Sequence, residues 1–338
     1  MESPKTLQET IQFFGDFDNC RLFMAALRWP DGIVRCPRCD SDAVAYLPKA
    51  RVYWCKGDHP RQKFSLKVGT VFEDSPIALE KWLPCVWMLV NDKNGISSWE
   101  LHRALGVTQK TAWFMLHRVR AALKTGGFVT KLGSADGGEV EVDETFIGGK
   151  PVNMHKSRRI AIQRARSEIS NCHKAQGFTR YPGKTVVQGI LDRDIRQVRA
   201  KVVPNVKRET LQSEVLNNVH HGSRVYTDSA VAYDNLRAQY VHEVVDHTEK
   251  YVQDRVHTNG LENFWSLLKR TLRGTYVAVE PFHLDRYVDE QSFRYNNRAT
   301  KDNPLNDADR FVYALSQIVG KRLTYKELTG KEGEASGF

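Results

Sequence analysis

The sequence contains no apolar run that approaches the roughly 20 residues of a membrane-spanning helix. Its first residues lack the basic start, apolar core and small-residue cleavage site of a secretory signal, so secretion is not expected. Cysteine is scarce, at six in 338 residues, and internal repeats are absent. These absences argue against a membrane protein, a secreted disulfide scaffold and a repeat protein. We expect a folded protein of two or three domains.

Acidic residues are also in deficit, because 40 Asp and Glu face 50 Lys and Arg, which leaves a net charge of +10. Such an excess is typical of proteins that bind polyanions such as nucleic acid, and it also occurs in basic proteins with other roles. The charge therefore permits a nucleic-acid partner, and the motifs must identify it.

Three of the six cysteines are close together. Cys36 and Cys39 form a Cys-x-x-Cys pair, and Cys55 follows a strand-like run. The position that would hold a fourth cysteine is Asp58, and the next residue, His59, offers an imidazole nitrogen. Four such ligands suit a tetrahedral zinc ion. We predict a zinc ribbon held by Cys36, Cys39, Cys55 and His59, with Asp58 as the other choice for the fourth ligand. The alternative is a ribbon without metal whose aromatic side chains hold its core.

The segment 77–124 has the apolar spacing of helices. Ser97 and Glu100 have the capping-box spacing of a helix start, Gly106 marks a turn, and Thr108 caps a second helix. This pattern predicts a helix-turn-helix, although an ordinary helical hairpin has the same spacing. In a helix-turn-helix the second helix would present to DNA the side chains of Gln109, Lys110, His117, Arg118 and Arg120.

The pattern changes to strand-like alternation from Glu139 onward. Three strands are followed by a helix, a strand, a helix, a strand and helices, with Asp192-Arg193-Asp194 as a hairpin turn. This order predicts an α/β fold of the RNase H-like class, in which helices flank a mixed sheet. Residues 150–184 interrupt the first two strands with nine basic residues and one acid. They are either a solvated loop or a basic arm that binds DNA phosphates, with Arg158 and Arg159 as expected contacts.

Three acids in this half of the chain suit a two-metal nuclease site. Asp143 and Asp228 fall at or near the ends of predicted strands that are neighbours in this fold, and Glu262 opens a predicted helix. Magnesium needs few protein carboxylates, so two aspartates and a third acid suffice. Lys269 lies about two helical turns after Glu262, and Asn259 one turn before it. Each acid alone is as readily explained as a surface or capping residue, and the combination favours catalysis.

These residues carry a resemblance that covers positions 7 to 315. The chain resembles the insertion sequence 1595 family of bacterial transposases in Val-Asp-Glu-Thr-Phe-Ile-Gly-Gly-Lys (142–150), Tyr-Thr-Asp-Ser (226–229), Val-His-Thr-Asn-Gly-Leu-Glu-Asn-Phe-Trp-Ser-Leu-Leu-Lys-Arg (256–270) and Phe-Arg-Tyr-Asn-Asn-Arg (293–298). The front end is similar to that family in Arg-Trp-Pro-Asp-Gly (28–32), the cysteine pair, Gly-Thr-Val-Phe (69–72) and Lys-Thr-Ala-Trp-Phe-Met-Leu-His-Arg (110–118).

The resemblance implies a transposase with an acid triad that binds the inverted repeats of its element and acts with magnesium or manganese. The third catalytic residue of that family is either Asn or Glu, and this chain offers Asn259 and Glu262, of which Glu262 is favoured. Arg270 is a further expected DNA contact. A homo-oligomer on double-stranded DNA and a location with the nucleoid in the bacterial cytoplasm are expected. The alternatives are a DNA-binding regulator derived from a transposase and a structure-selective nuclease.

The expected organisation has six parts. They are an N-terminal helical segment (1–32), a zinc ribbon (33–75), a helix-turn-helix region (76–125), a linker (126–138), an RNase H-like catalytic domain (139–300) and a C-terminal tail (301–338).

Overall fold

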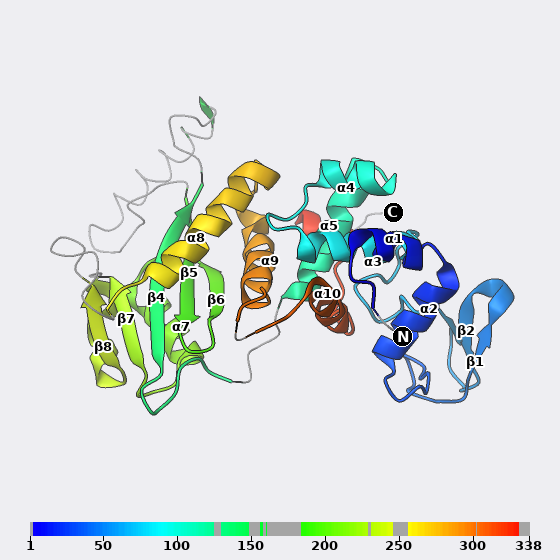
Figure 1. Cartoon of the computed structure of the whole chain (residues 1–338), viewed down its shortest axis with the longest axis horizontal. Coiled ribbons are helices and arrows are strands. Elements are labelled where there is room, and N and C mark those ends of the chain that lie inside the picture. The colour runs from blue at the N-terminus through cyan, green and yellow to red at the C-terminus, as the bar shows by residue number, and fades with distance from the viewer. Residues whose placement is uncertain are drawn as a thin grey trace. The chain divides into compact units, whose positions relative to one another are not determined.

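The computed structural model divides the chain into two compact units (Figure 1). The first combines Met1–Thr125 with Asn297–Phe338, and the second is Gly126–Asn296. The structure describes residues 3–124, 130–148, 156–157, 160, 184–228, 231–245, 256–301 and 303–330. Most of the predicted basic insertion, including Arg158 and Arg159, lies outside these residues.

The first unit begins with two short helices, α1 (Leu7–Phe14) and α2 (Phe17–Arg28). Thr6 caps α1, and the Asp16 carboxylate caps α2, so the two helices are separated at Gly15. Their apolar faces pack with α3 (Leu79–Asn91) and α10 (Asp307–Ser316). Aromatic rings fill this core, with Phe14 5.8 Å and Trp87 5.2 Å from the ring of Phe311.

The ribbon is a three-stranded antiparallel sheet of β1 (Val44–Leu47), β2 (Val52–Cys55) and β3 (Lys63–Phe64). The short turn η1 (Pro48–Ala50) joins β1 to β2. One face of the sheet carries Tyr46, Tyr53 and Phe64, with 5.6 Å between the rings of Tyr53 and Phe64. This is a small core, so the ribbon needs a further source of stability.

The predicted helical hairpin consists of α4 (Ser98–Leu105) and α5 (Gln109–Leu123). The capping box of Ser97 and Glu100 is present, and Gly106 adopts the left-handed conformation, φ 59°, that favours glycine. The expectation that His117, Arg118 and Arg120 are exposed is wrong, because their side chains are buried.

Contacts both near and distant in sequence surround these side chains. The Arg118 guanidinium donates to the Glu73 carbonyl and lies 5.6 Å from the Trp82 ring. The His117 ring packs 4.6 Å from that of Trp113. Charged side chains are seldom buried without such partners. The basic end of α5 therefore holds the unit together and does not present a base-reading surface.

The C-terminal segment differs from the expected tail. It contains α10 and α11 (Tyr325–Thr329), each of which begins with a capping box, from Asn306 and Asp309 and from Thr324 and Glu327. Phe311 and Leu328 are fully buried in the first unit. The end of the chain thus completes the core that α1 and α3 begin.

The second unit is built on a five-stranded sheet of β4 (Glu139–Ile147), β5 (Thr185–Asp192), β6 (Gln197–Val203), β7 (Arg224–Asp228) and β8 (Val241–Val245). The strand order is β6-β5-β4-β7-β8. β4, β5 and β6 pair antiparallel, whereas β7 and β8 are parallel to β4, so the sheet is mixed as predicted.

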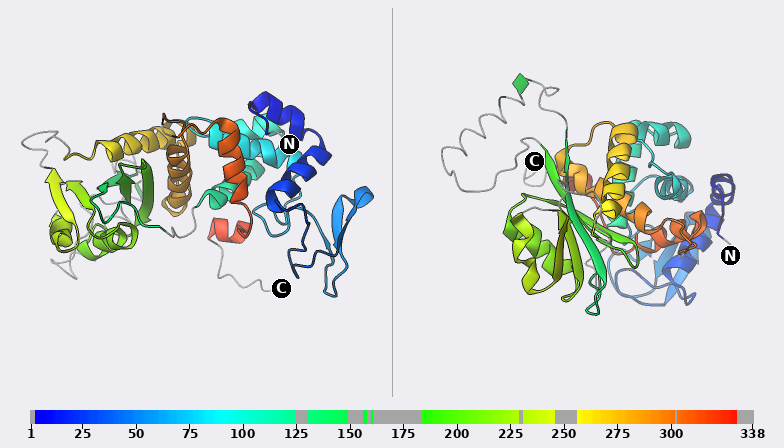
Figure 2. Two further views of the ribbon diagram at one scale, coloured as in Figure 1. Left: turned by 60° about the horizontal axis from the view of Figure 1, so that its bottom comes forward. Right: turned by 60° about the vertical axis from the view of Figure 1, so that its left-hand side comes forward.

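Helices cover both faces of this sheet (Figures 1 and 2). One face packs against α7 (Arg208–Asn218) and η3 (Val231–Ala238), and the other against α8 (Asn259–Thr271) and α9 (Leu284–Asn296). The turns η4 (Leu272–Tyr276) and η5 (Pro281–His283) connect α8 to α9. Alternate residues of β4 and β5 supply the two cores, as the period of a strand requires. Part of the predicted linker also joins this unit, because Leu132 is buried and pairs with Val219.

α9 also closes the outer edge of the sheet. The Asn296 side chain accepts from the Val198 N–H at 2.7 Å and donates to its carbonyl at 2.9 Å. The Asp285 carboxylate accepts from the Val202 N–H at 3.0 Å. Within α9, Arg294 forms a buried ion pair with Glu290. These polar residues of α9 are therefore structural.

Within the described part of the chain, every helix is too short or too polar to span a bilayer.

Candidate functional site

The ribbon gathers four metal-ligating side chains at one point. The sulfur atoms of Cys36, Cys39 and Cys55 and a ring nitrogen of His59 all lie within 4.8 Å of one another. The Cys36 sulfur is 3.4 Å from His59 Nε2, and the Cys39 and Cys55 sulfurs are 3.6 Å apart. This arrangement matches the predicted Cys3His set, and Asp58 is not part of the cluster. Three thiolates and an imidazole are ligands that zinc prefers.

Neighbouring backbone groups favour the metal-binding forms of His59 and Cys36. His59 Nδ1 lies 2.8 Å from the Pro60 carbonyl, and a proton on Nδ1 would leave Nε2 free to face the sulfurs. Burial raises the pKa of Cys36, but N–H groups of Arg38 and Cys39 that point at its sulfur outweigh burial and lower the pKa to about 7. A metal-binding thiol must lose its proton, so this environment favours metal binding.

In the second unit, the strand register aligns two of the predicted acids. Glu141 of β4 is paired with Tyr226 of β7 in parallel. Two residues further along each strand lie Asp143 and Asp228, which places both on the same face of adjacent strands. Asp228 ends β7 as predicted, but Asp143 lies in the middle of β4, because the hairpin with β5 continues to Ile147.

α8 crosses this face next to Asp143. The indole N–H of Trp265 donates to Asp143 Oδ2 at 2.8 Å. The Trp265 ring lies over Gly189, which is the partner of Asp143 on β5. A Cβ atom at Gly189 would be 2.7 Å from two ring atoms of Trp265, so only glycine allows the helix to approach this closely. Trp265 was not identified from the sequence, although it lies three residues after Glu262 on the same helical face.

The charges of Asp228 and Glu262 act on Asp143. The pKa of Asp143 is raised to about 6, first by burial and also by the Asp228 and Glu262 carboxylates, while the hydrogen bond from Trp265 acts in the opposite sense. Burial, together with Asp143 and Asp228, also holds the pKa of Glu144 well above its usual value. Like charges that raise a buried carboxyl's pKa in this way favour a cation among them. The donor set therefore suits a hard divalent metal.

α8 carries the remaining predicted residues of this site. Asn259 and Glu262 are exposed in its first turn, and Lys269 is partly buried two turns later. Burial lowers the pKa of Lys269, Arg273 lowers it further, and Asp143 acts in the opposite sense. Lys269 is therefore close enough to Asp143 to sense its charge. Of the two choices for the third residue, Glu262 is the one that acts on Asp143.

The acids are spread more widely than the ribbon ligands. Among the described residues, the Cys3His group is the one set of possible metal ligands whose atoms all lie within 4.8 Å. The three acids come from β4, β7 and α8, and Asp228 and Glu262 act on Asp143 although the three do not form so compact a group.

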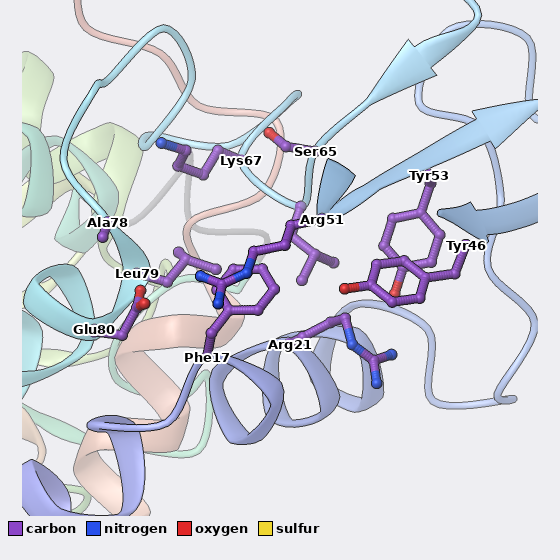
Figure 3. Close-up of a pocket in the computed structure, with 11 residues that line it drawn as sticks. Phe17, Arg21, Tyr46, Arg51, Tyr53, Ser65, Lys67, Ala78, Leu79 and Glu80 are labelled. Carbon is purple, nitrogen blue, oxygen red and sulfur yellow. The ribbon is translucent and has the colours of Figure 1, made fainter. Parts of the chain in front are cut away.

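A pocket of about 220 Å³ lies between the ribbon, α2 and the start of α3 (Figure 3). The guanidinium of Arg21 is 4.3 Å from the Tyr46 ring centroid, and that of Arg51 is 4.5 Å from the Phe17 ring centroid. Lys67 donates to backbone carbonyls at 2.5 Å and 3.1 Å. Rings and carbonyls thus engage these cations, and the pocket marks the junction of ribbon and helices.

The predicted DNA contacts on α4, α5 and α8 have different environments. Gln109 donates to the Ser98 hydroxyl at 2.8 Å, and the Lys110 amine lies 5.0 Å from the Tyr325 ring centroid. Lys110 and Arg270 are exposed. These two cations remain available to a polyanion, whereas the basic end of α5 does not.

A mixed sheet with a helix-borne acid beside two strand-borne aspartates, together with a Cys3His ribbon, is consistent with a zinc-ribbon DDE transposase. Comparison with known families supports this class. Residues 136–296 match the ISXO2-like transposase domain, and residues 16–57 match the transposase zinc-ribbon domain.

Two similar proteins also have transposase or transposable-element descriptions. An uncharacterized transposase-like protein of Haemophilus influenzae is 32% identical over 106 residues, which are 31% of this chain and 85% of that protein. An uncharacterized protein in transposable element ISH50 of Halobacterium salinarum is 27% identical over 256 residues, which are 74% of this chain and 81% of that protein. The chain belongs to the insertion sequence 1595 family of ISXO2-like transposases with an N-terminal zinc ribbon. That family implies DNA binding.

Proposed function

We propose that this protein is the DNA transposase of an insertion sequence, which binds the terminal inverted repeats of its element, cuts the DNA and transfers the strands. The observation that carries the proposal is the alignment of Asp143 and Asp228 on adjacent parallel strands, with Glu262 acting on Asp143 from α8. Paired strand aspartates and a helix acid form the ligand set that phosphodiester chemistry with two metals uses.

Each residue of the site has a proposed role. Asp143, Asp228 and Glu262 would hold magnesium or manganese, which activates the attacking hydroxyl or water and stabilises the leaving oxygen. Asn259, one turn before Glu262, is the second choice for the third ligand. Lys269 would bind the DNA backbone next to Asp143. The Trp265 hydrogen bond would fix the orientation of the Asp143 side chain.

The first unit would deliver the DNA. A zinc-loaded ribbon and the α4–α5 hairpin, with Gln109 and Lys110 at the start of α5, would recognise the element ends. The exposed Arg270 of α8 would contact the backbone. Joining the two ends of the element requires that one protein–DNA complex hold both ends, so we infer a homo-oligomer on DNA.

The test compares variants on duplexes taken from the flanks of the gene. Asp228→Asn should abolish magnesium-dependent cleavage and transfer and retain end binding, because the amide cannot replace a charged ligand. Asp234→Asn is the matched control, since this aspartate is exposed in η3, and it should cut normally. Glu262→Gln should resemble Asp228→Asn, and Asn259→Ala should retain cleavage.

The outcomes separate the alternatives. Joined products from the wild type that disappear in Asp228→Asn support a transposase. Binding without cleavage would indicate a regulator derived from a transposase. Nicks unrelated to the element ends would indicate a nuclease, and cleavage by Asp228→Asn in magnesium would refute the acid assignment.

A further inference from the structure

A cluster of charged side chains lies beneath the start of α8, and none of its members is a proposed metal ligand. We call it the α8 anchor, formed by Glu141, Arg193 and His257. The Glu141 side chain is 1% exposed, and Arg193 Nε donates to its carboxylate at 2.7 Å. Arg193 also donates to the His257 carbonyl and lies 2.9 Å from His257 Nδ1. The anchor thus joins β4, the turn after β5 and the segment that leads into α8.

The second oxygen of Glu141 binds the helix itself. Glu141 Oε2 accepts from the Leu261 N–H, the third residue of α8, at 2.9 Å. The side chain of the N-cap residue, Thr258, makes no capping hydrogen bond, and the first amide of the helix, that of Asn259, donates to the His257 ring at 3.4 Å. Glu141 supplies a capping hydrogen bond from the neighbouring strand. A Cβ at Gly260 would lie 2.8 Å from this oxygen, so glycine is what lets the carboxylate reach the backbone.

α8 is therefore held to β4 at two points. Glu141 binds Leu261, and Asp143 accepts from Trp265. Two residues along a strand span roughly 6.6 Å, and four residues along a helix roughly 6 Å, so both contacts can form together without strain. Glu262 directly follows Leu261, which means that the first point of contact sets the position of the third proposed ligand.

We propose that Arg193 is a positioning residue for the metal site, acting through Glu141 and α8; this rests on the proposed function. Without Arg193, Glu141 would be a buried carboxylate with much of its charge uncompensated. It would recruit water in place of the Leu261 amide, and the start of α8 would loosen. Glu262 would then move relative to Asp143, which weakens metal binding while leaving all three acids in the sequence.

The experiment measures the Mg²⁺ concentration needed for half-maximal cleavage of a duplex that carries an element end. Arg193→Gln should raise this concentration about ten- to a hundredfold, as expected when a residue that orients metal ligands is lost. Arg193→Lys keeps the charge but cannot donate in parallel to Glu141 and His257. Its Mg²⁺ requirement should therefore lie between those of the wild type and Arg193→Gln. The control is Lys201→Gln, a cation on β6 whose side chain is 63% exposed and paired with Glu214.

A second measurement reports on the anchor without using activity. Hydrogen exchange of the backbone amides in 256–266 should be faster in Arg193→Gln than in the wild type and unchanged in Lys201→Gln. Zinc content and a single cooperative thermal transition verify that each variant is folded. If Arg193→Gln does not fold, Arg193→Lys is compared alone.

The results distinguish the two proposals. If the wild type cuts and Arg193→Gln has an unchanged Mg²⁺ requirement, the positioning role is refuted and the proposed function stands. The same holds for Arg193→Lys where Arg193→Gln does not fold. If the wild type does not cut element ends in any divalent metal, the proposed function is refuted and the positioning role with it. A raised requirement together with faster exchange at Leu261 supports the proposal.

Discussion

The ribbon of the first unit holds its four ligand atoms within 4.8 Å, whereas the acids of the second unit come from two strands and a helix and are more widely spread. The ribbon ligands lie on a small sheet with few core residues of its own. The acids lie on a five-stranded sheet with packed cores on both faces. In the ribbon, metal binding would stabilise the fold, and in the second unit the fold supplies the stability and places the ligands.

This difference determines what each region does without metal. The ribbon can lose thiol protons to bind zinc, and we expect its fold to depend on that ion. The acid site holds repelling carboxylates in place at a cost to the stability of the unit, as the raised pKa of Asp143 indicates. Removing a ligand should thus destabilise the ribbon and stabilise the acid site.

The largest effect is expected in the ribbon. Cys55→Ser should lose zinc and unfold the ribbon, because binding of structural zinc contributes on the order of 10 kcal/mol in small domains. The measurement is zinc per chain with thermal unfolding. Asp58→Asn is the control and should keep one zinc ion, since Asp58 is outside the cluster. Full zinc content in Cys55→Ser, or its loss in Asp58→Asn, would contradict the ligand set.

A smaller effect is expected where α8 meets the sheet. Gly189→Ala should destabilise the second unit by about 1–3 kcal/mol and weaken cleavage, because the added methyl displaces Trp265. Chemical denaturation measures the loss. Gly274→Ala is the matched control, since nothing lies within 4 Å of a Cβ at Gly274, and this variant should have nearly the stability of the wild type. Equal stability of the two variants would show that α8 packs less closely than described.

The smallest effect is a gain in stability. The pKa of Asp143, about 6 in the folded protein, is above its ordinary value of 3.8, so the folded state binds more protons than the unfolded state between these values. Stability of the metal-free protein therefore falls as pH rises through this range. Asp143→Asn removes this penalty, which is about 3 kcal/mol for a rise of this size, but it leaves a buried amide in place of the carboxyl, so it should add about 1–2 kcal/mol at pH 7, with no gain below pH ~4. Denaturation curves at the two pH values in a chelator check this, and a gain that is the same at both would refute the explanation.

Local patterns predicted much of the fold and of the site. The Cys-x-x-Cys pair and Cys55 predicted the ribbon ligands, and the structure selects His59 over Asp58. Alternation predicted the order of strands and helices along the chain, and the fold class that it indicated made the strands of Asp143 and Asp228 neighbours, as the sheet has them. These features depend on spacing along the chain, which the sequence contains directly.

Features that depend on distant partners were missed. Arg118 is basic and on a helix, but the carbonyl that it binds belongs to Glu73, 45 residues earlier. Glu141 was not singled out from the sequence, and its partners are in the turn after β5 and in α8. The C-terminal segment was expected to be a tail, yet the core partners of its Phe311 lie more than 200 residues away. Charge and helical period do not identify such contacts.

The capping of β6 by α9 limits how copies of this protein can associate. An edge strand with free N–H and carbonyl groups invites a strand from another chain to add to the sheet. Here Asn296 and Asp285 already bind the backbone of Val198 and Val202. A second copy would have to displace these side chains before it extended the sheet at β6. Assembly of copies should therefore leave the β6 edge closed, which also protects the unit from aggregation through β6.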